Sequence, residues 1–258
     1  MSRTLDLHTG RRSATQREPR PNVWRRVRRR ALQSVLALLV IVVAALAAGA
    51  IYVATLPSVA DAPARVQRIL ALHHEPFERA PAPARLEDAV VAVEDEHFYD
   101  NFLINFLSGA GRAAVATLQA SSDPGGSTIP QQLAKVLYGD GSGWAATVRQ
   151  IGLGIRLSLH YSQPRLLNLY LNAVYYGNGY WGYAAAAHGY FHTSPQKLDW
   201  AQAAMLAGLP QAPSTYDPVR HYALARQRQR HVLDQLVANH YLTAAQADAA
   251  FREPLALR

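Results

Sequence analysis

The sequence contains no cysteine at any of its 258 positions. Disulfide bridges, thiolate metal sites and cysteine nucleophiles are therefore excluded, and the usual cue to the redox compartment is missing. Charged residues are also scarce, at 17% of the chain, whereas 50% of the chain is hydrophobic. This balance excludes a chain that is disordered as a whole and is typical of one well-packed domain with an appendage.

An alternating apolar and polar pattern, which would predict β-strands, is absent as well. From residue 86 onwards, apolar residues instead recur at helical spacing, and no internal repeat is visible. Later helices are expected at 144–160, 164–176, 184–191, 198–209, 219–240 and 243–251. We therefore predict an all-α domain.

Positive charge is concentrated at the N-terminus. The formal net charge is +8, and much of it comes from arginines within residues 1–30. Residues 31–56 carry no charge and form an apolar run longer than the ~20 residues that a helix needs to cross a bilayer. We predict a basic cytoplasmic tail over 1–30 and a transmembrane anchor over 31–56, with the N-terminus inside and the rest of the chain exported.

A cleaved signal peptide is the alternative for this run, because Ala47, Ala48 and Ala50 offer the small residues that a signal peptidase requires. The run is longer than a typical signal-peptide core, which favours the anchor. Since the apolar run accounts for the arginines before it, we expect no nucleic acid as a partner.

Prolines punctuate residues 57–85, which contain Pro57, Pro63, Pro76, Pro81 and Pro83. Only one short helical piece, at 65–72, interrupts them. The composition predicts a stalk between the membrane and a domain that spans 86–258.

The stretch LEDAVVAVEDEHFYDN, residues 86–101, puts two adjacent carboxylates beside an apolar helical stripe. Glu94 lies one turn after Val90, on the flank of that stripe. A partly desolvated carboxylate has a raised pKa, which suits it to accept a proton near neutral pH. The alternative interpretation is a solvated acidic helix end.

A dense apolar patch, FLINFL, follows at residues 102–107. In a soluble domain such a patch belongs to the core, but next to a membrane anchor it can equally enter lipid. The sequence leaves both interpretations open.

The stretch GGSTIPQQLAK, residues 125–135, has the pattern of a capped helix N-terminus. Thr128 is followed three residues later by Gln131, which is a capping-box spacing, and Lys135 lies one turn further on. Backbone N–H groups at such a terminus, together with the lysine, suit an anionic group such as phosphate. An ordinary capped helix is the alternative.

Near the C-terminus, Arg226, Arg228 and Arg230 alternate within the expected helix 219–240. We interpret them as a solvated helix face. The histidines of the chain form no convincing set of metal ligands, so the sequence leaves any metal site unknown.

Five blocks together resemble the family 51 peptidoglycan glycosyltransferases, the lysozyme-like domain of bifunctional penicillin-binding proteins and of monofunctional biosynthetic transglycosylases. In the family's order they are EDEHF at 94–98, GGSTIPQQLAK at 125–135, a helix around Arg149, the block from 165 to 191, and AMLAGLPQAPSTYDP at 204–218. No transpeptidase domain follows Arg258, so we expect the monofunctional form.

The resemblance implies a lysozyme-like fold and a polymerase that joins lipid-linked disaccharide-peptide units, lipid II, to a nascent glycan strand with inversion. It implies a bacterial cytoplasmic membrane location with the catalytic domain in the periplasm. Membrane lipid and other cell-wall synthesis proteins are the further partners that it suggests. It also allows a divalent cation, Mg²⁺ or Mn²⁺, for which Asp95 is the one candidate ligand that the sequence suggests.

By the same resemblance, Glu94 is the general base, and Asp95 orients it or its surroundings. The residues that match substrate-binding positions are Phe98, Ser127, Thr128, Gln131, Gln132, Lys135, Arg149, Gln150, Tyr170 and Asn172. Among these, Lys135 suits a charge-assisted contact to the pyrophosphate of the leaving group.

The sequence departs from the family pattern most strongly in the third block. Without a gap, the family's Arg-Lys pair falls on Ala146 and Thr147, and its second functional glutamate falls on Gln150. A shifted register that aligns Arg149 puts Leu153 at the acid, so neither register supplies a carboxylate. The smaller departures are Asn101, Leu103, Pro130, Val136 and Asn168.

Three hypotheses follow. The first is an active glycan polymerase, which the retained Glu94, Asp95 and Lys135 favour. The second is a catalytically impaired member that binds lipid II or acts as a scaffold for the cell-wall machinery, which the third-block losses favour. The third is a lysozyme-like hydrolase, against which the block at 125–135 argues.

Overall fold

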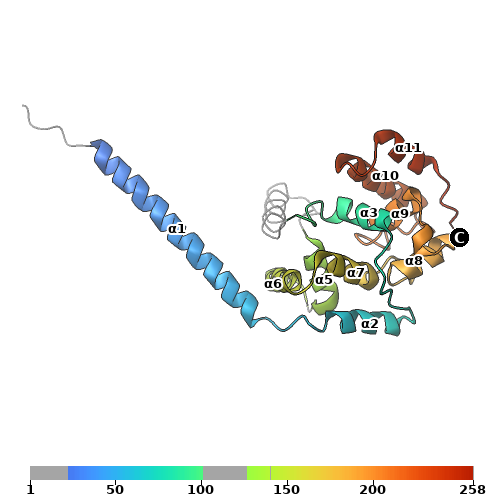
Figure 1. Ribbon diagram of the computed structural model, residues 1–258, viewed down its shortest axis with the longest axis horizontal. Helices are drawn as coiled ribbons and strands as arrows, with labels where there is room; N and C mark the ends of the chain where they lie inside the picture. Colours follow the sequence, from blue (N-terminus) through green and yellow to red (C-terminus); the bar gives the residue numbers. More distant parts are fainter. Residues whose placement is uncertain (1–22, 101–126, 140, 258) are drawn as a thin grey trace, which may run out of the picture. The chain divides into compact units, whose positions relative to one another are not determined.

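The computed structural model describes residues 23–100, 127–139 and 141–257 (Figure 1). The chain divides into two compact units, Met1–Ile51 and Tyr52–Arg258. The predicted features at Asn101, at 102–107 and in the glycines before Ser127 lie outside the described residues.

Helices account for all the regular structure in the described ranges, which confirms the predicted all-α class. They are α1 (Val23–Thr55), α2 (Ala62–Leu72), α3 (Ala84–Glu94), α5 (Ile129–Tyr138), α6 (Trp144–His160), α7 (Gln163–Ala173), α8 (Tyr183–Phe191), the 3₁₀ helix η1 (Pro195–Lys197), α9 (Trp200–Gly208), α10 (Tyr222–Ala238) and α11 (Ala244–Arg252). An isolated antiparallel bridge joins Tyr175 and Trp181.

Helix α1 makes up the described part of the first unit and continues into the second. Its segment Val27–Thr55 is 29 residues long and apolar enough to cross a membrane. Its large apolar side chains are exposed, as a lipid-facing helix requires. This span fits the membrane-anchored protein that the sequence predicts.

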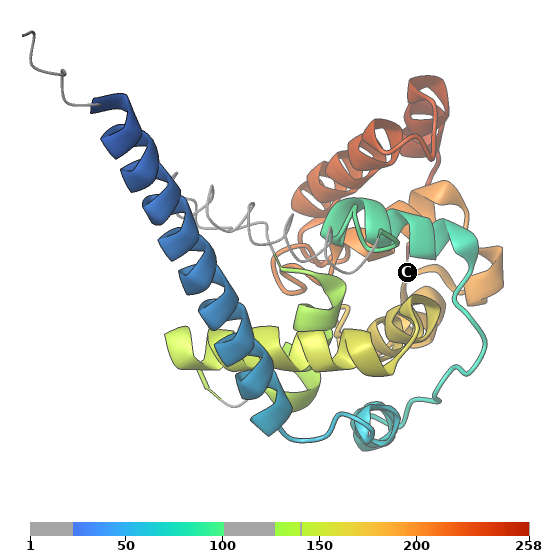
Figure 2. The ribbon, with the colours of Figure 1, turned by 60° about the vertical axis from the view of Figure 1, so that its left-hand side comes forward.

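In the second unit, α3 packs on α9 and α10, and α5 packs on α6 and α7 (Figure 2). The predicted stripe of α3 is confirmed, since Leu86, Ala89 and Val90 are fully buried in the core. The core therefore fixes the C-terminal end of α3, where Glu94 and Asp95 stand.

Several predicted helices differ at their ends from the observed ones; the helix expected at 219–240, for example, runs from Tyr222 to Ala238. The helix expected at 164–176 ends at Ala173, because the chain turns extended at Val174 and pairs Tyr175 with Trp181. Gly177 follows with φ of 87°, and a Cβ there would come within 2.8 Å of the Pro213 carbonyl oxygen. At 198–209, α9 starts only after Asp199, whose carboxylate accepts from the Gln202 N–H at 2.8 Å.

Residues 57–85, predicted as a stalk, contain α2 and contribute to the core of the second unit. Buried side chains of this segment include Val59, Ala62, Val66, Leu70 and Ala82. The prolines mark helix starts here, since Pro63 stands in the first turn of α2 and Pro83 is the N-cap of α3.

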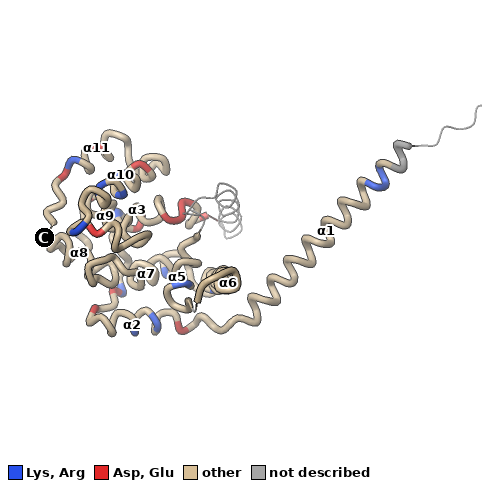
Figure 3. Tube along the Cα trace, turned by 180° about the vertical axis from the view of Figure 1, so that it is seen from behind, with Lys and Arg blue, Asp and Glu red and all other residues tan. Residues whose placement is uncertain are grey.

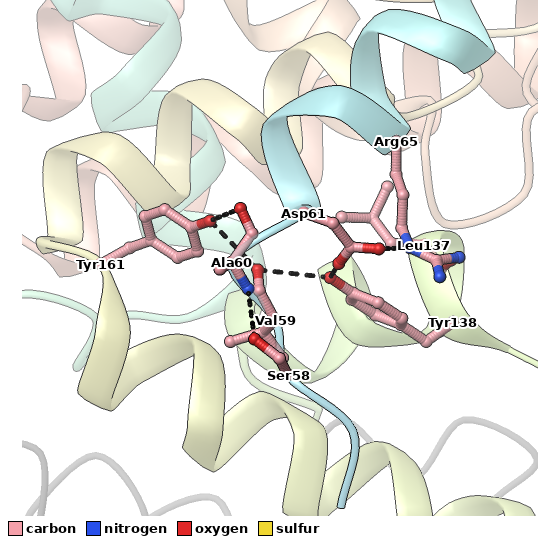
Figure 4. A network of polar contacts seen from close by, with 8 residues as sticks. All are labelled: Ser58, Val59, Ala60, Asp61, Arg65, Leu137, Tyr138 and Tyr161. Carbon is pink, nitrogen blue, oxygen red and sulfur yellow. Dashed lines mark hydrogen bonds and ion pairs between the residues drawn. The ribbon is translucent and has the colours of Figure 1, made fainter.

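The start of α2 is bonded to α5 and α6 through a polar network (Figure 4). The Tyr138 hydroxyl donates to Asp61 at 2.7 Å, and Arg65 donates to the other oxygen of the same carboxylate at 2.7 Å. Burial acts to raise the pKa of Asp61, but these two donors outweigh it and hold that pKa below its ordinary value. The Tyr161 hydroxyl donates to the Val59 and Ala60 carbonyls at 3.0 and 3.1 Å.

Candidate active site

Glu94 is the last residue of α3, and its side chain is only 10% exposed. One carboxylate oxygen, Oε2, accepts a hydrogen bond of 2.7 Å from the Gln132 amide nitrogen. The other, Oε1, lies 3.6 Å from a guanidinium nitrogen of Arg228. The carboxylate is therefore held between an amide donor from α5 and a cation from α10.

Gln132 is itself oriented by Tyr170 of α7. The fully buried Tyr170 hydroxyl donates to the Gln132 amide oxygen at 2.8 Å, which leaves the amide nitrogen to face Glu94. Burial, followed by the nearby negative charge of Glu94, raises the pKa of Tyr170 well above its ordinary value. Tyr170 thus stays protonated and remains a donor.

Asp95 connects α3 to the start of α5. It is 1% exposed, and its Oδ2 accepts from the Ile129 backbone N–H at 3.1 Å. That N–H belongs to the first turn of α5, where backbone donors have no partner within the helix. Asp95 therefore positions the beginning of α5 beside Glu94.

The capping box predicted at the start of α5 is confirmed. The Gln131 side chain accepts from the Thr128 backbone N–H at 3.2 Å, and Pro130 fits into the first turn. Thr128 is buried and Ser127 is exposed. Lys135 is exposed one turn beyond Gln131, on the same side of the helix.

Other residues predicted to bind substrate are placed in the protein interior or on α6. Phe98 lies in the core at 2% exposure. Asn172 is 1% exposed, and its side chain exchanges hydrogen bonds with the Glu78 backbone, donating at 3.1 Å and accepting at 3.0 Å. Arg149 and Gln150 lie half-buried on α6.

Helix α6 approaches α5 closely at Gly154. A Cβ at this glycine would lie 3.1 Å from the backbone nitrogen of Gln131. The close approach places the helix that carries Arg149 and Gln150 directly against the helix that carries Gln131 and Gln132.

The interpretation of Arg226, Arg228 and Arg230 as a solvated face is wrong for Arg228, which is 12% exposed and faces Glu94. Its Nε also donates to the Gly208 carbonyl at 3.3 Å. Residues two apart in a helix point in nearly opposite directions, so Arg228 cannot share a face with its two neighbours. The helical period itself could have located it, because Arg228 precedes the buried Val232 by one turn.

The other two arginines also have partners in the protein. Arg226 lies 3.9 Å from the centroid of the Phe251 ring, and Arg230 bonds to Asp248 at 2.6 Å. Both therefore tie α10 to α11 and are half-buried.

Among the residues that the structure describes, no group of three or more His, Asp or Glu side chains could hold a metal ion. Asp95, the one residue that the sequence suggested for this purpose, accepts from a backbone N–H instead. The residues that the structure describes around Glu94 therefore do not fit a divalent cation.

Comparison with known proteins identifies the family. A family model described as Transglycosylase matches residues 64–237. A candidate transglycosylase of Cupriavidus necator is 38% identical over 177 residues, which cover 68% of this chain and 76% of that protein. Penicillin-binding protein 1A of Neisseria flavescens is 36% identical over 175 residues, which cover 67% of this chain.

The chain spans only 22% of that penicillin-binding protein, so the match concerns one part of it. Among solved structures, penicillin-binding protein 1A of Haemophilus influenzae aligns with 71% of this chain and 18% of its own, at 24% identity and a TM-score of 0.42. The match of the family model over most of the second unit confirms the resemblance and the lysozyme-like, all-α fold. This chain therefore belongs to the transglycosylase family.

Proposed function

We propose that this protein is a peptidoglycan glycosyltransferase that polymerises lipid II, with Glu94 as its general base. The observation that carries the proposal is the Glu94 carboxylate, held between the Gln132 amide at 2.7 Å and the Arg228 guanidinium at 3.6 Å. Such fixed partners keep one carboxylate in one orientation, which general base catalysis requires.

In the proposed reaction, Glu94 accepts the proton of the acceptor sugar's hydroxyl as that oxygen attacks the anomeric carbon of the donor. The new C–O bond forms as the bond to the lipid pyrophosphate breaks, so the configuration at that carbon inverts. Arg228 stabilises the ionised carboxylate before the transfer. Tyr170 acts as a positioning residue, because it fixes the amide of Gln132.

The leaving pyrophosphate requires positive or hydrogen-bonding groups. We assign this role to Lys135, which is exposed on the same side of α5 as Gln131. Ser127, Gln131, Arg149 and Gln150 complete the proposed substrate contacts, since they lie on or beside the two helices that meet at Gly154.

A catalytically impaired, lipid II-binding scaffold is the second candidate, and α6 supplies the observation that favours it. The helix contains no aspartate or glutamate, and Gln150 is neutral. The Thr147 hydroxyl donates to the Gly143 carbonyl of its own helix at 3.2 Å. Helix α6 thus offers neither the carboxylate nor the basic pair that the family pattern has in this block.

The proposed setting is a bacterial cytoplasmic membrane, with the basic tail inside and the catalytic domain in the periplasm. The support is the arginine-rich sequence before α1, which predicts that orientation. The nascent glycan strand and other cell-wall synthesis proteins are the proposed partners on that side.

The test is incubation of the detergent-solubilised full-length protein with labelled lipid II, resolving the products by length. Glu94→Gln keeps the size of the side chain but removes the proton acceptor, so we expect loss of polymer by at least about 100-fold. Glu96→Gln makes the same change of charge two residues away, at an exposed side chain, and should polymerise as the wild type does.

Equal polymer from the wild type and Glu94→Gln would overturn the assignment of the base. Lipid II binding without polymer from the wild type would replace the polymerase with the scaffold. Shortened strands from added glycan would instead indicate a hydrolase.

A further inference from the structure

A polar cavity lies between two loops that the proposed proton transfer does not use. Its volume is about 400 Å³, which is within the range of cavities that hold small ligands. Side chains from the turn at 175–179, which follows α7, form one wall, and side chains from the loop at 214–221, which precedes α10, form the other. Both walls belong to the second compact unit.

The backbone holds the first wall in one conformation. Gly177, Asn178 and Gly179 have φ of 87°, 50° and 87°, in the left-handed region. The Tyr175 hydroxyl accepts from the Gly179 N–H at 3.0 Å. At Gly177 the backbone passes close to the Pro213 carbonyl, at the start of the second wall. The cavity is therefore formed before any ligand arrives, which lowers the cost of binding.

Asp217 is a buried charged group of this cavity. Its side chain is 4% exposed, and its Oδ1 accepts from the Val219 backbone N–H at 2.9 Å. Its Oδ2 lies 3.6 Å from Nε of Arg220, which is beyond hydrogen-bond distance. Since each carboxylate oxygen has two acceptor positions, Oδ2 can accept a short hydrogen bond from a cationic ligand.

Exposed side chains supply the positive charge and the donors. Arg220 is 73% exposed, so its guanidinium can turn from Asp217 towards a ligand. His221 and Ser214 also line the cavity, and both are exposed. The cavity thus offers a fixed, buried carboxylate next to a guanidinium that can move.

The surrounding charge favours neither sign. Acidic and basic residues are interspersed over the second unit (Figure 3), and the arginine excess of the chain lies in its first 30 residues. Steering of a polyanion or a polycation requires an extended surface of one sign. The local arrangement therefore selects the ligand, and it matches a molecule that carries both an ammonium and a carboxylate.

The second wall also connects the cavity to the candidate active site. Tyr216 stands between Ser214 and Asp217 in the sequence, and the Arg228 guanidinium carbon lies 6.0 Å from the centroid of its ring. Arg228 in turn pairs with Glu94. An extended peptide gains about 3.3 Å per residue, so a few residues attached to a sugar at Glu94 suffice to cross these two contacts.

We propose that this cavity binds the peptide part of lipid II, with a side-chain ammonium on Asp217 and a carboxylate on Arg220 and His221. The identity of the ligand rests on the proposed function, whereas its recognition rests on the two charges. Binding replaces one ion pair of 3.6 Å by two charge-assisted hydrogen bonds, one at Asp217 and one at Arg220. These residues bind and orient the substrate, and they take no part in the proton transfer.

The test uses the detergent-solubilised full-length protein and a soluble probe. The probe is an N-acetylated pentapeptide with a central lysine and a free C-terminus. Isothermal titration calorimetry compares it with the same peptide after acetylation of the lysine, and with the same peptide after amidation of the C-terminus. We expect each modification to weaken binding by about 10-fold, because each removes one charge-assisted hydrogen bond.

Variants of the cavity separate the two charges. Asp217→Asn keeps an oxygen for the Val219 N–H, so the loop should stay folded, and only the charge is removed. It should bind the free peptide about 10-fold more weakly and the lysine-acetylated peptide as the wild type does. Arg220→Gln should lose the discrimination between the free and the amidated C-terminus. Asp234→Asn is the matched control, because Asp234 is 55% exposed and pairs with an arginine of α10 outside the cavity.

Equal affinities of the wild type for the three peptides, or no binding of any of them, would overturn the proposal. Binding that depends on Arg220 but not on Asp217 would also overturn it, because the cavity would then be a simple anion site.

The proposed function is tested separately. Glu94→Gln leaves the cavity unchanged and should bind the free peptide as the wild type does. Peptide binding by a wild type that makes no polymer would overturn the polymerase and keep the peptide site. Polymer from a wild type that binds no peptide would overturn the peptide site and keep the polymerase.

Discussion

Helices α3 and α6 differ in their surroundings and in the side chains that they carry. Helix α3 is covered by α9 and α10 and carries carboxylates, including Glu94 at its end. Helix α6 contacts α5, carries no carboxylate and leaves an apolar face exposed. Helix α3 holds the Glu94 carboxylate in a fixed position, whereas α6 exposes apolar side chains. We therefore expect the candidate chemistry to depend on α3 and its neighbours.

The largest effect on stability is expected from removing the ion pair between Arg228 of α10 and Glu94 of α3. Arg228→Met leaves Glu94 at 10% exposure without its cation, so the free energy of unfolding should fall by about 3 kcal/mol. Adding Glu94→Gln should recover much of that loss, because the buried charge is then gone. Denaturant unfolding followed by circular dichroism measures both.

Arg230→Met is the matched control for this pair. Arg230 lies on the same helix and bonds to Asp248, but the two side chains are 39% and 48% exposed. Its loss should cost at most about 1 kcal/mol. Equal losses of unfolding free energy in Arg228→Met and Arg230→Met would show that the buried Arg228–Glu94 pair contributes no more to stability than the exposed pair.

The next largest effect is expected at the close contact between α5 and α6. Gly154→Val introduces a Cβ 3.1 Å from the Gln131 backbone nitrogen, so the helices must move apart. We expect a loss of about 2 kcal/mol in the free energy of unfolding. The exposed Ala145→Val, on the same helix, should cost only about 0.5 kcal/mol, the difference in helix propensity. Similar values for the two variants would mean that α6 is only loosely packed.

A smaller effect is expected at Tyr170. Tyr170→Phe removes the donor to the Gln132 amide oxygen, which leaves a buried acceptor without this bond and should cost about 1 kcal/mol in stability. If Tyr170 positions Gln132, polymerisation should fall further through kcat than through KM. A variant with lower stability but unchanged kcat would leave Tyr170 with a packing role.

The smallest effect concerns the acidic surface of α3. Burial raises the pKa of Asp88 above its ordinary value, so the folded state binds a proton more readily than the unfolded state does. The stabilising contribution is present below the unfolded pKa and is lost as the pH rises through the folded one. Asp88→Asn should therefore be more stable than the wild type at pH 7, by about 0.5 kcal/mol or less, and lose that advantage near pH 4. A constant difference between the two proteins across this range would contradict the assignment.

Local patterns predicted local structure well. The stripe of α3 and the capping box of Thr128 and Gln131 depend on residues within one or two turns, and both are confirmed. The prolines of 57–85 were misleading because proline fits a first helical turn as well as a stalk.

The contacts around Glu94 could not be predicted in the same way. Gln132, Tyr170 and Arg228 come from three helices that only the packing of the core brings together. The family resemblance named the first two, but a pattern of alternating arginines concealed the third.

Side-chain donors of Arg156, in α6, and of Tyr161, just after it, hold residues 53–60, and this joint has two classes of position. The acceptors at Val53, Ala54, Leu56, Val59 and Ala60 are backbone carbonyls, which every residue type provides. The two donors act through side chains that few substitutions can replace. The carbonyl side of the joint is therefore free to vary in sequence, and a saturation mutagenesis of the joint would find its intolerance gathered on α6 and the turn that follows it.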